Sequence, residues 1–261
     1  MTIIQAIILG TIQGLTELLP ISSSAHLFLA QWIFESWTIP ESFNVALHFG
    51  TLLAIGIFFF RDFLELIMGG VKQVVKKEKT VEGRMFWYLV IATIPGGIIG
   101  YLLDNSLSGI LEKPLIIAIA LIVIGIILYL ADKYSKSKTE YKELTLKQTF
   151  FMGLFQCLAF IPGVSRSGIT ITTGRVMGVK REAAARFSFM LSAPIVLAAT
   201  IFKIKDFVFD LPFVIGVIAS FVVGILVIKF LLEYLKKGSL KIFAIYRLVI
   251  GLGVIAYMII K

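Results

Sequence analysis

The amino-acid sequence predicts an all-α, polytopic membrane protein, and three observations support that fold class. Hydrophobic residues make up 58% of the 261-residue chain, charged residues make up 16%, and the mean hydropathy is +0.95. Because soluble domains carry about 25% charged residues, a soluble fold of this length would leave too much apolar surface in water. The apolar residues also gather into long runs, and two further apolar segments are broken by polar motifs.

Six apolar runs approach the roughly 20 residues that a membrane-spanning helix needs. They cover residues 43–60, 85–103, 114–131, 187–202, 211–232 and 242–260. We therefore expect six transmembrane helices. The segment between the first two runs is rich in charged residues and is expected to be a loop.

The two broken segments cover residues 3–34 and 148–177, and their interruptions read LPISSSAH (19–26) and IPGVSRSG (161–168). Proline, serine and glycine interrupt a helix, which is tolerated at membrane depth only where protein or water covers the backbone. Each segment is therefore predicted to form a re-entrant helical hairpin with a polar tip.

The two halves of the chain repeat each other. When the alignment of the two halves is shifted by one residue at the proline, six residues of the first half match six of the second. The matches are Gly10 with Gly153, Gln13 with Gln156, Leu15 with Leu158, Pro20 with Pro162, Ser22 with Ser165 and Ser24 with Ser167. Each half is one hairpin followed by three spans, and an odd number of crossings inverts the second half. We predict a single membrane domain with repeat one at 1–131, a cytoplasmic linker at 132–147 and repeat two at 148–261, whose tips meet near the midplane.

The net charge of +9 is explained by membrane topology rather than by nucleic acid, which we exclude as a partner. Basic residues lie in short loops without interleaved aromatic residues. Most of the 25 lysines and arginines fall in one set of loops, whereas the opposite loops hold only Lys113, Lys203, Lys205 and Lys261. The lysine-rich side should be cytoplasmic, so both termini and the first hairpin are expected to open outward.

The hairpin tips carry one charge each, Glu17 in the first and Arg166 in the second. An ionisable residue at membrane depth is costly and therefore indicates a functional site. A structural ion pair that braces the hairpins is the alternative. The polar neighbours favour function; they are Gln13, Ser22, Ser23, Ser24 and His26 in the first tip, and Ser165, Ser167 and Thr170 in the second.

These residue types suggest phosphate chemistry. Ser23 lies within one helical turn of His26, the pairing of a nucleophile with its base, although the serines could simply cap a helix and His26 could be an interfacial residue. Two helix N-termini and an arginine fork favour a phosphate, and a lone carboxylate suggests a divalent cation shared with the substrate. His48 is expected to be buried structure, and Arg247 could reach either the polar centre or an interface.

The motifs QGLTELLPISSSAH (13–26) and PGVSRSG (162–168) resemble the two signature motifs of the undecaprenyl-pyrophosphate phosphatases of the bacitracin-resistance type. The resemblance covers the whole chain, including its two halves and the FSF–LS–P stretch at 187–194. It implies an enzyme of the plasma membrane that removes the terminal phosphate of undecaprenyl pyrophosphate, with Mg²⁺ or Ca²⁺ and an active site on the outer side. Such activity recycles the lipid carrier for peptidoglycan and gives bacitracin resistance when abundant.

The resemblance also implies a role for each tip residue. Glu17, preceded by Gln13 at a position where the motif allows a second glutamate, would be the acidic site linked to the metal. Ser23 would be the nucleophile or a phosphate ligand, and His26 its base or acid. Arg166 would clamp the phosphate, and the remaining hydroxyls would complete the cradle: Ser22, Ser24, Ser165, Ser167 and Thr170.

Two other functional classes remain open at this stage. An inverted repeat with broken hairpins is also typical of transporters, so a lipid or anion flippase using the same midplane site is the main alternative. A purely structural membrane subunit would not need such polar tips. Membrane lipid and a polyprenyl pyrophosphate are the expected partners, and a homodimer is a candidate assembly.

Overall fold

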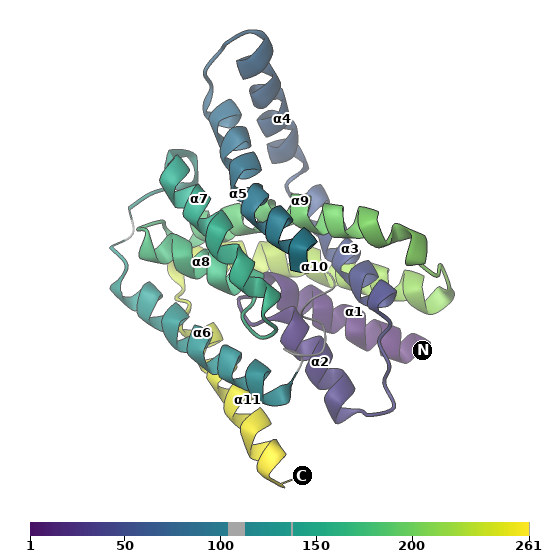
Figure 1. The fold of residues 1–261 in the computed structure, drawn as a ribbon. Coiled ribbons are helices and arrows are strands. Elements are labelled where there is room, and N and C mark those ends of the chain that lie inside the picture. Colours follow the sequence, from purple (N-terminus) through teal and green to yellow (C-terminus); the bar gives the residue numbers. More distant parts are fainter. Residues whose placement is uncertain (104–112, 137, 261) are drawn as a thin grey trace.

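A computed structural model describes residues 1–103, 113–136 and 138–260 of the chain. Ser137, in the expected linker, and Lys261, counted among the outward lysines, lie outside the described residues. The described residues fold into α-helices and short 3₁₀ helices (Figure 1). The α-helices are α1 (Ile3–Leu18), α2 (Ser23–Ile33), α3 (Glu41–Phe58), α4 (Phe60–Val75), α5 (Val81–Leu103), α6 (Pro114–Tyr134), α7 (Leu146–Phe155), α8 (Arg166–Val176), α9 (Arg181–Lys203), α10 (Leu211–Lys237) and α11 (Lys241–Ile260). The 3₁₀ helices are η1 (Tyr141–Glu143), η2 (Gln156–Phe160) and η3 (Ile204–Asp206).

The predicted all-α membrane fold is confirmed. Within the described residues, six helices are long and apolar enough to cross a membrane, namely α3, α5, α6, α9 with η3, α10 and α11. Each contains one of the six predicted apolar runs, apart from a residue or two at some ends. Several helices extend past the apolar run into polar residues, because the backbone hydrogen bonds of a helix can continue beyond the apolar layer of the membrane.

The two broken segments are each divided at the predicted place. The first becomes α1 and α2, separated at residues 19–22, and the second becomes α7 with η2 and then α8, separated at residues 161–165. Pro20 and Pro162 lie in these breaks, where a proline removes a backbone donor and ends a helix. Re-entry of each pair into the bilayer from one side stays a prediction.

Helix α4 was not predicted, since its segment was expected to be a loop. It is the most amphipathic of the helices, with charged Glu65 and Lys72 exposed and Leu66 and Gly70 buried. Charged residues lowered its mean hydropathy below that of a span, although the helical period of its apolar residues was present in the sequence. It packs mainly against the N-terminal half of α5, and α4 and this half of α5 project from the rest of the molecule (Figure 1).

The hairpins of the two halves pack on spans of the opposite half. Helix α1 lies along α10, and α7 lies along α5, while α6 and α11 run side by side (Figure 1). Close approach requires glycine in both hairpins: a Cβ on Gly14 would lie 2.8 Å from the Ser220 carbonyl oxygen, and Gly153 faces the Ala92 backbone even more tightly. Small residues at such crossings are the usual means by which membrane helices pack closely.

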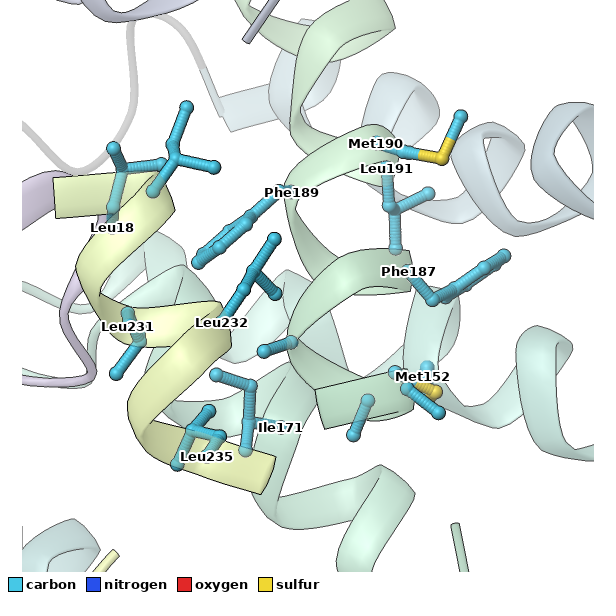
Figure 2. Close-up of a cluster of buried hydrophobic side chains, with 14 of the residues drawn as sticks. Leu18, Met152, Ile171, Phe187, Phe189, Met190, Leu191, Leu231, Leu232 and Leu235 are labelled. Atoms are coloured by element: carbon cyan, nitrogen blue, oxygen red, sulfur yellow. The ribbon is translucent and has the colours of Figure 1, made fainter. Parts of the chain in front are cut away.

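The largest apolar core lies between α9 and α10, behind the tips, and includes Leu18, Phe187, Phe189 and Leu231 (Figure 2). A polar cluster closes its far end. The buried Asp132 carboxylate accepts hydrogen bonds from Arg175 Nε (2.9 Å) and Arg181 Nε (2.7 Å). This core and cluster hold α8 and α9 in place, and these helices carry tip two.

Candidate active site

The two breaks, which we call tip one (residues 19–24) and tip two (residues 161–167), have matching local geometry. Ser22 has φ 77° and Ser165 has φ 73°, both in the left-handed region that non-glycine residues rarely adopt. The Ser22 hydroxyl accepts from the Ala25 backbone N–H, and the Ser165 hydroxyl accepts from that of Gly168. Both serines are therefore helix N-caps, so the capping alternative holds for Ser22.

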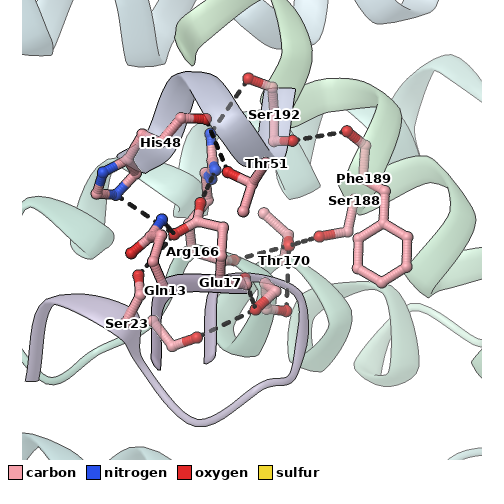
Figure 3. Close-up of polar contacts among 12 residues, drawn as sticks. Gln13, Glu17, Ser23, His48, Thr51, Arg166, Thr170, Ser188, Phe189 and Ser192 are labelled. Carbon is pink, nitrogen blue, oxygen red and sulfur yellow. Dashed lines mark hydrogen bonds and ion pairs between the residues drawn. The ribbon is translucent and has the colours of Figure 1, made fainter. Parts of the chain in front are cut away.

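Glu17, at the end of α1, is the centre of the polar contacts between the tips (Figure 3). Its Oε2 accepts from the Ser23 hydroxyl at 2.6 Å and from Gln13 Nε2 at 3.1 Å. Its Oε1 accepts from Arg166 Nη2 in a short ion pair. A buried carboxylate is tolerated only with such partners. Of these donors, Ser23 belongs to tip one and Arg166 belongs to tip two.

Arg166 is the first residue of α8, and its guanidinium reaches across the site. Besides the ion pair with Glu17, its Nη1 donates to the Ser192 carbonyl oxygen of α9 at 3.2 Å. Two separate partners fix the plane of the guanidinium, whose remaining N–H groups are free to point at a ligand. An arginine oriented in this way can bind a phosphate through two parallel hydrogen bonds.

His48 of α3 completes the cluster around Glu17, contrary to the expectation that it would be buried structure. Its Nε2 lies 3.4 Å from Glu17 Oε2, and its Nδ1 lies 2.9 Å from the backbone carbonyl oxygen of Asn44, one turn earlier. The sequence held only a weak signal, a histidine on an otherwise apolar span. Its importance depends on α3 crossing α1 beside Glu17, which is a tertiary feature.

The expected contact between His26 and Ser23 is not formed. His26 Nδ1 lies 2.7 Å from the Ser22 carbonyl oxygen, and Nε2 lies 2.7 Å from the Tyr246 hydroxyl. Because α2 begins at Ser23, the side chain of His26 projects from the next turn toward α11, not back toward the Ser23 hydroxyl. Both ring nitrogens are occupied, so His26 braces tip one against α11.

The remaining predicted residues divide into two groups. Ser24 and Ser165 line the cavity beside Glu17, together with Ser22 and Ser23. Ser167 instead donates toward the Glu17 and Leu19 carbonyl oxygens, each at 3.1 Å, and ties the tips together. The Thr170 hydroxyl is fully buried and lies 2.6 Å from that of Ser188, so it supports α8 from behind.

Arg247, a fully buried residue of α11, contacts both breaks. Its Nη1 donates to the Pro20 carbonyl oxygen at 3.1 Å, and its Nη2 donates to that of Gly163 at 2.7 Å. These carbonyls belong to the two breaks, where helix termination leaves backbone acceptors without partners. Of the two expectations for Arg247, the structure supports the polar centre over the interface.

A cavity of about 280 Å³ opens beside this cluster and has two chemically different sides. The polar side is formed by Glu17, Ser22, Ser23, Ser24, Asn44, His48, Ser165 and Arg166, while Gln156 of η2 lies beside Gly96 on the other side. The other side, from α5, η2 and α9, is mostly apolar and consists of Gly96, Ala159, Phe160, Ile195, Val196 and Ala199, with Val45 of α3. An anionic head group with an apolar tail would match both sides.

A larger cavity, of about 750 Å³, is lined by charged residues of both signs, among them Asp62, Glu82, Lys180 and Arg186. It includes no residue of either tip. Size alone would favour it as the active site, but a concave site with convergent polar groups is the stronger indicator of chemistry. The smaller cavity is therefore the candidate active site.

The donor atoms around the smaller cavity fit a hard divalent cation. Within the described residues, no three His, Cys, Asp or Glu side chains gather to form a protein-only metal site. The side-chain oxygens of Gln13, Asn44 and Gln156 are buried without a hydrogen-bond partner in the described chain, and Asn44 and Gln156 line the cavity. Mg²⁺ commonly uses one or two carboxylates and substrate phosphates, and Ca²⁺ also accepts amide oxygens.

Comparison with known proteins identifies the family of the chain. Residues 6–253 match a family model described as "Bacitracin resistance protein BacA". A protein of Pelotomaculum thermopropionicum named undecaprenyl-diphosphatase is 48% identical over 98% of this chain and 96% of its own. Proteins with the same name from Moorella thermoacetica and Desulforudis audaxviator are 45% and 46% identical, each over 98% of both chains.

Proposed function

Since the chain belongs to the bacitracin resistance protein BacA family, we propose that it is an undecaprenyl-diphosphatase. It hydrolyses undecaprenyl pyrophosphate to undecaprenyl phosphate and phosphate, and so recycles the lipid carrier for peptidoglycan and other envelope polymers. The observation that carries this proposal within the structure is the convergence of Glu17, Ser23 and Arg166 on a cavity with one polar and one apolar side.

In this proposal, the pyrophosphate occupies the polar side of the cavity. Arg166 and the N-termini of α2 and α8 offer donors and positive dipole ends to its oxygens. The isoprenoid chain leaves along the apolar side, past Gly96 and Ile195, toward surrounding lipid. An amphiphilic substrate is thereby bound with its terminal phosphorus near tip one.

Hydrolysis requires attack on the terminal phosphorus and cleavage of its bond to the bridging oxygen, which departs on undecaprenyl phosphate. Ser23 is the candidate nucleophile, because its hydroxyl already donates to Glu17 Oε2 at 2.6 Å and can transfer its proton there. Its attack would leave the phosphoryl group on Ser23, and a water would then cleave this phosphoserine to release phosphate and restore the hydroxyl. A water held at the same carboxylate would give the same products in one step. Arg166 offsets the charge on the phosphoryl oxygens as the bond to the leaving group loosens.

We also propose a divalent cation, Mg²⁺ or Ca²⁺, as the cofactor. Glu17, with the amide oxygens of Asn44 and Gln156, would hold it together with phosphate oxygens of the substrate. The cation would neutralise part of the pyrophosphate charge. Gln13 in place of a second carboxylate leaves Glu17 as the one acidic group of the site, so the cation depends on the substrate for further charge.

The site is proposed to face the outer side of the plasma membrane. The support is the distribution of basic residues, because most of them lie in the connections α4–α5, α6–α7, α8–α9 and α10–α11 or in the helix ends that flank these connections. A homodimer remains the candidate assembly, and light scattering of the detergent-solubilised protein would measure it. Cysteine labelling of the α2–α3 and α10–α11 connections in intact cells would test the orientation.

The decisive experiment measures phosphate release from undecaprenyl pyrophosphate by the purified protein in detergent. Release should require a divalent cation, stop with chelator, and fall in Glu17→Ala, Ser23→Ala and Arg166→Ala. A well-folded protein that releases no phosphate would contradict the proposal. Translocation of the intact lipid between leaflets would then support the transport alternative, which the matching geometry of the two tips also permits.

A further inference from the structure

His48 occupies a position that neither the motifs nor the family comparison assigns. It lies on α3, outside both tips, and its imidazole faces the same carboxylate oxygen that accepts from Ser23 (Figure 3). The side chain is 27% exposed and lines the cavity, whereas the Glu17 carboxylate behind it is only 6% exposed. His48 is therefore the more exposed member of the pair, and both residues line the space for the substrate.

The orientation of the ring follows from its two neighbours. The Asn44 carbonyl oxygen only accepts hydrogen bonds, so Nδ1 carries a hydrogen and donates to it along the helix. This contact fixes the ring so that Nε2 points at Glu17. A carboxylate oxygen also only accepts, so the contact is favourable when Nε2 carries a hydrogen as well.

Three groups thus converge on Glu17 Oε2, while Arg166 alone engages Oε1. Ser23 lies at 2.6 Å, Gln13 Nε2 at 3.1 Å and His48 Nε2 at 3.4 Å. Gln13 comes from the same helix as Glu17, but His48 comes from α3 and approaches from the cavity side. Without His48, the carboxylate could rotate toward Arg166 and lose its alignment with the Ser23 hydroxyl.

We propose that His48 is a positioning residue for this reaction: it holds Glu17 in the rotamer that receives the Ser23 proton and keeps Arg166 on the opposite oxygen. The inference rests on the proposed phosphatase function. The base role expected for His26 passes to Glu17, and His48 acts only through Glu17 rather than on Ser23 directly. The positioning requires a hydrogen-bond donor to Glu17 at the place of His48 Nε2. A glutamine amide offers such a donor, so glutamine at this position should largely preserve the function of histidine.

The test compares His48→Gln and His48→Leu with the wild-type protein in the phosphate-release assay. Orienting partners of functional ligands typically contribute about 10–100-fold, so kcat of the leucine variant should fall by about that factor while KM changes much less. The glutamine variant should retain kcat within about fivefold of wild type, because it keeps a donor. Glu41→Gln, at the exposed start of α3, is the matched control and should be unaffected.

A double-mutant cycle separates positioning from a general effect on folding. In a Glu17→Gln background, His48→Leu should lower the residual rate by no more than about threefold, because interacting residues are non-additive. An equal loss in both backgrounds, or a fully active leucine variant, would overturn the proposal. A wild-type protein without phosphate release would instead overturn the proposed function, and that outcome is distinguishable because it precedes any variant.

Discussion

Tip one and tip two are built on the same backbone but carry different groups at matching positions. In each, a serine with positive φ caps the next helix, and its hydroxyl lies 3.2 Å from that of the serine two residues later. The residue between these serines differs, being Ser23 in tip one and Arg166 in tip two. Each is the first residue of its helix, and both contact Glu17.

The matching glutamines show the same divergence. Gln13 donates to Glu17, whereas Gln156 donates to the Ala92 carbonyl oxygen of α5 at 2.9 Å. Glu17 itself has an apolar counterpart, since the same offset places Phe160 in the second segment. The two breaks thus provide two similar capped helix ends, and in the proposed function their different side chains make one end the acidic, nucleophilic side and the other the phosphate-binding side.

The largest effect is expected at Arg166, whose ion pair with Glu17 joins the two tips. Arg166→Ala should lower kcat/KM by about 10³–10⁵-fold, since an arginine that offsets charge in phosphoryl transfer contributes about that much. Arg166→Lys should recover little, because lysine cannot make the planar, two-point contact. Phosphate release at saturating and limiting substrate would measure both variants. Near-normal activity of Arg166→Lys would mean that only charge, and not the fork, is needed at tip two.

The position between the cap serines gives a direct test in tip one. Ser23→Ala should lower kcat by about 10²–10⁴-fold if Ser23 attacks phosphorus, because the nucleophile itself is lost. Ser23→Cys would keep a nucleophile and could trap a phosphorylated intermediate for mass spectrometry. Near-normal release by Ser23→Ala would assign the attack to a water held by Glu17, and Ser23 would then only position that carboxylate.

Arg247 is predicted to support both tips equally. Arg247→Met removes donors to Pro20 and Gly163 and leaves these buried carbonyls without partners, which costs about 1–3 kcal/mol for each group. The melting midpoint in detergent should therefore fall substantially, and hydrogen exchange should rise at residues of both breaks. Faster exchange at only one break would show that Arg247 supports the tips unequally.

The sequence allowed the fold and the broken helices to be predicted, because hydropathy, proline and cap residues act locally. The proximity of Glu17 and Arg166 also followed from the expected meeting of the two tips, although an ion pair between them was only the structural alternative. The role of His48 did not follow, because it depends on α3 crossing α1. The orientation of His26 toward Tyr246 and the pairing of Arg175 with Asp132 likewise depend on helices distant in sequence.

The smallest effect should come from the caps, where the two tips are most alike. Ser22→Ala and Ser165→Ala should each destabilise the protein by about 1 kcal/mol, because each removes one acceptor for a backbone N–H. Glycine at either position should cost less than alanine, since the positive φ no longer strains the residue. Equal shifts in melting midpoint for the two alanine variants would show that the tips share one backbone design. A much larger shift at Ser22 would mean that its hydroxyl stabilises tip one through more than the 3.4 Å contact with the Ala25 N–H.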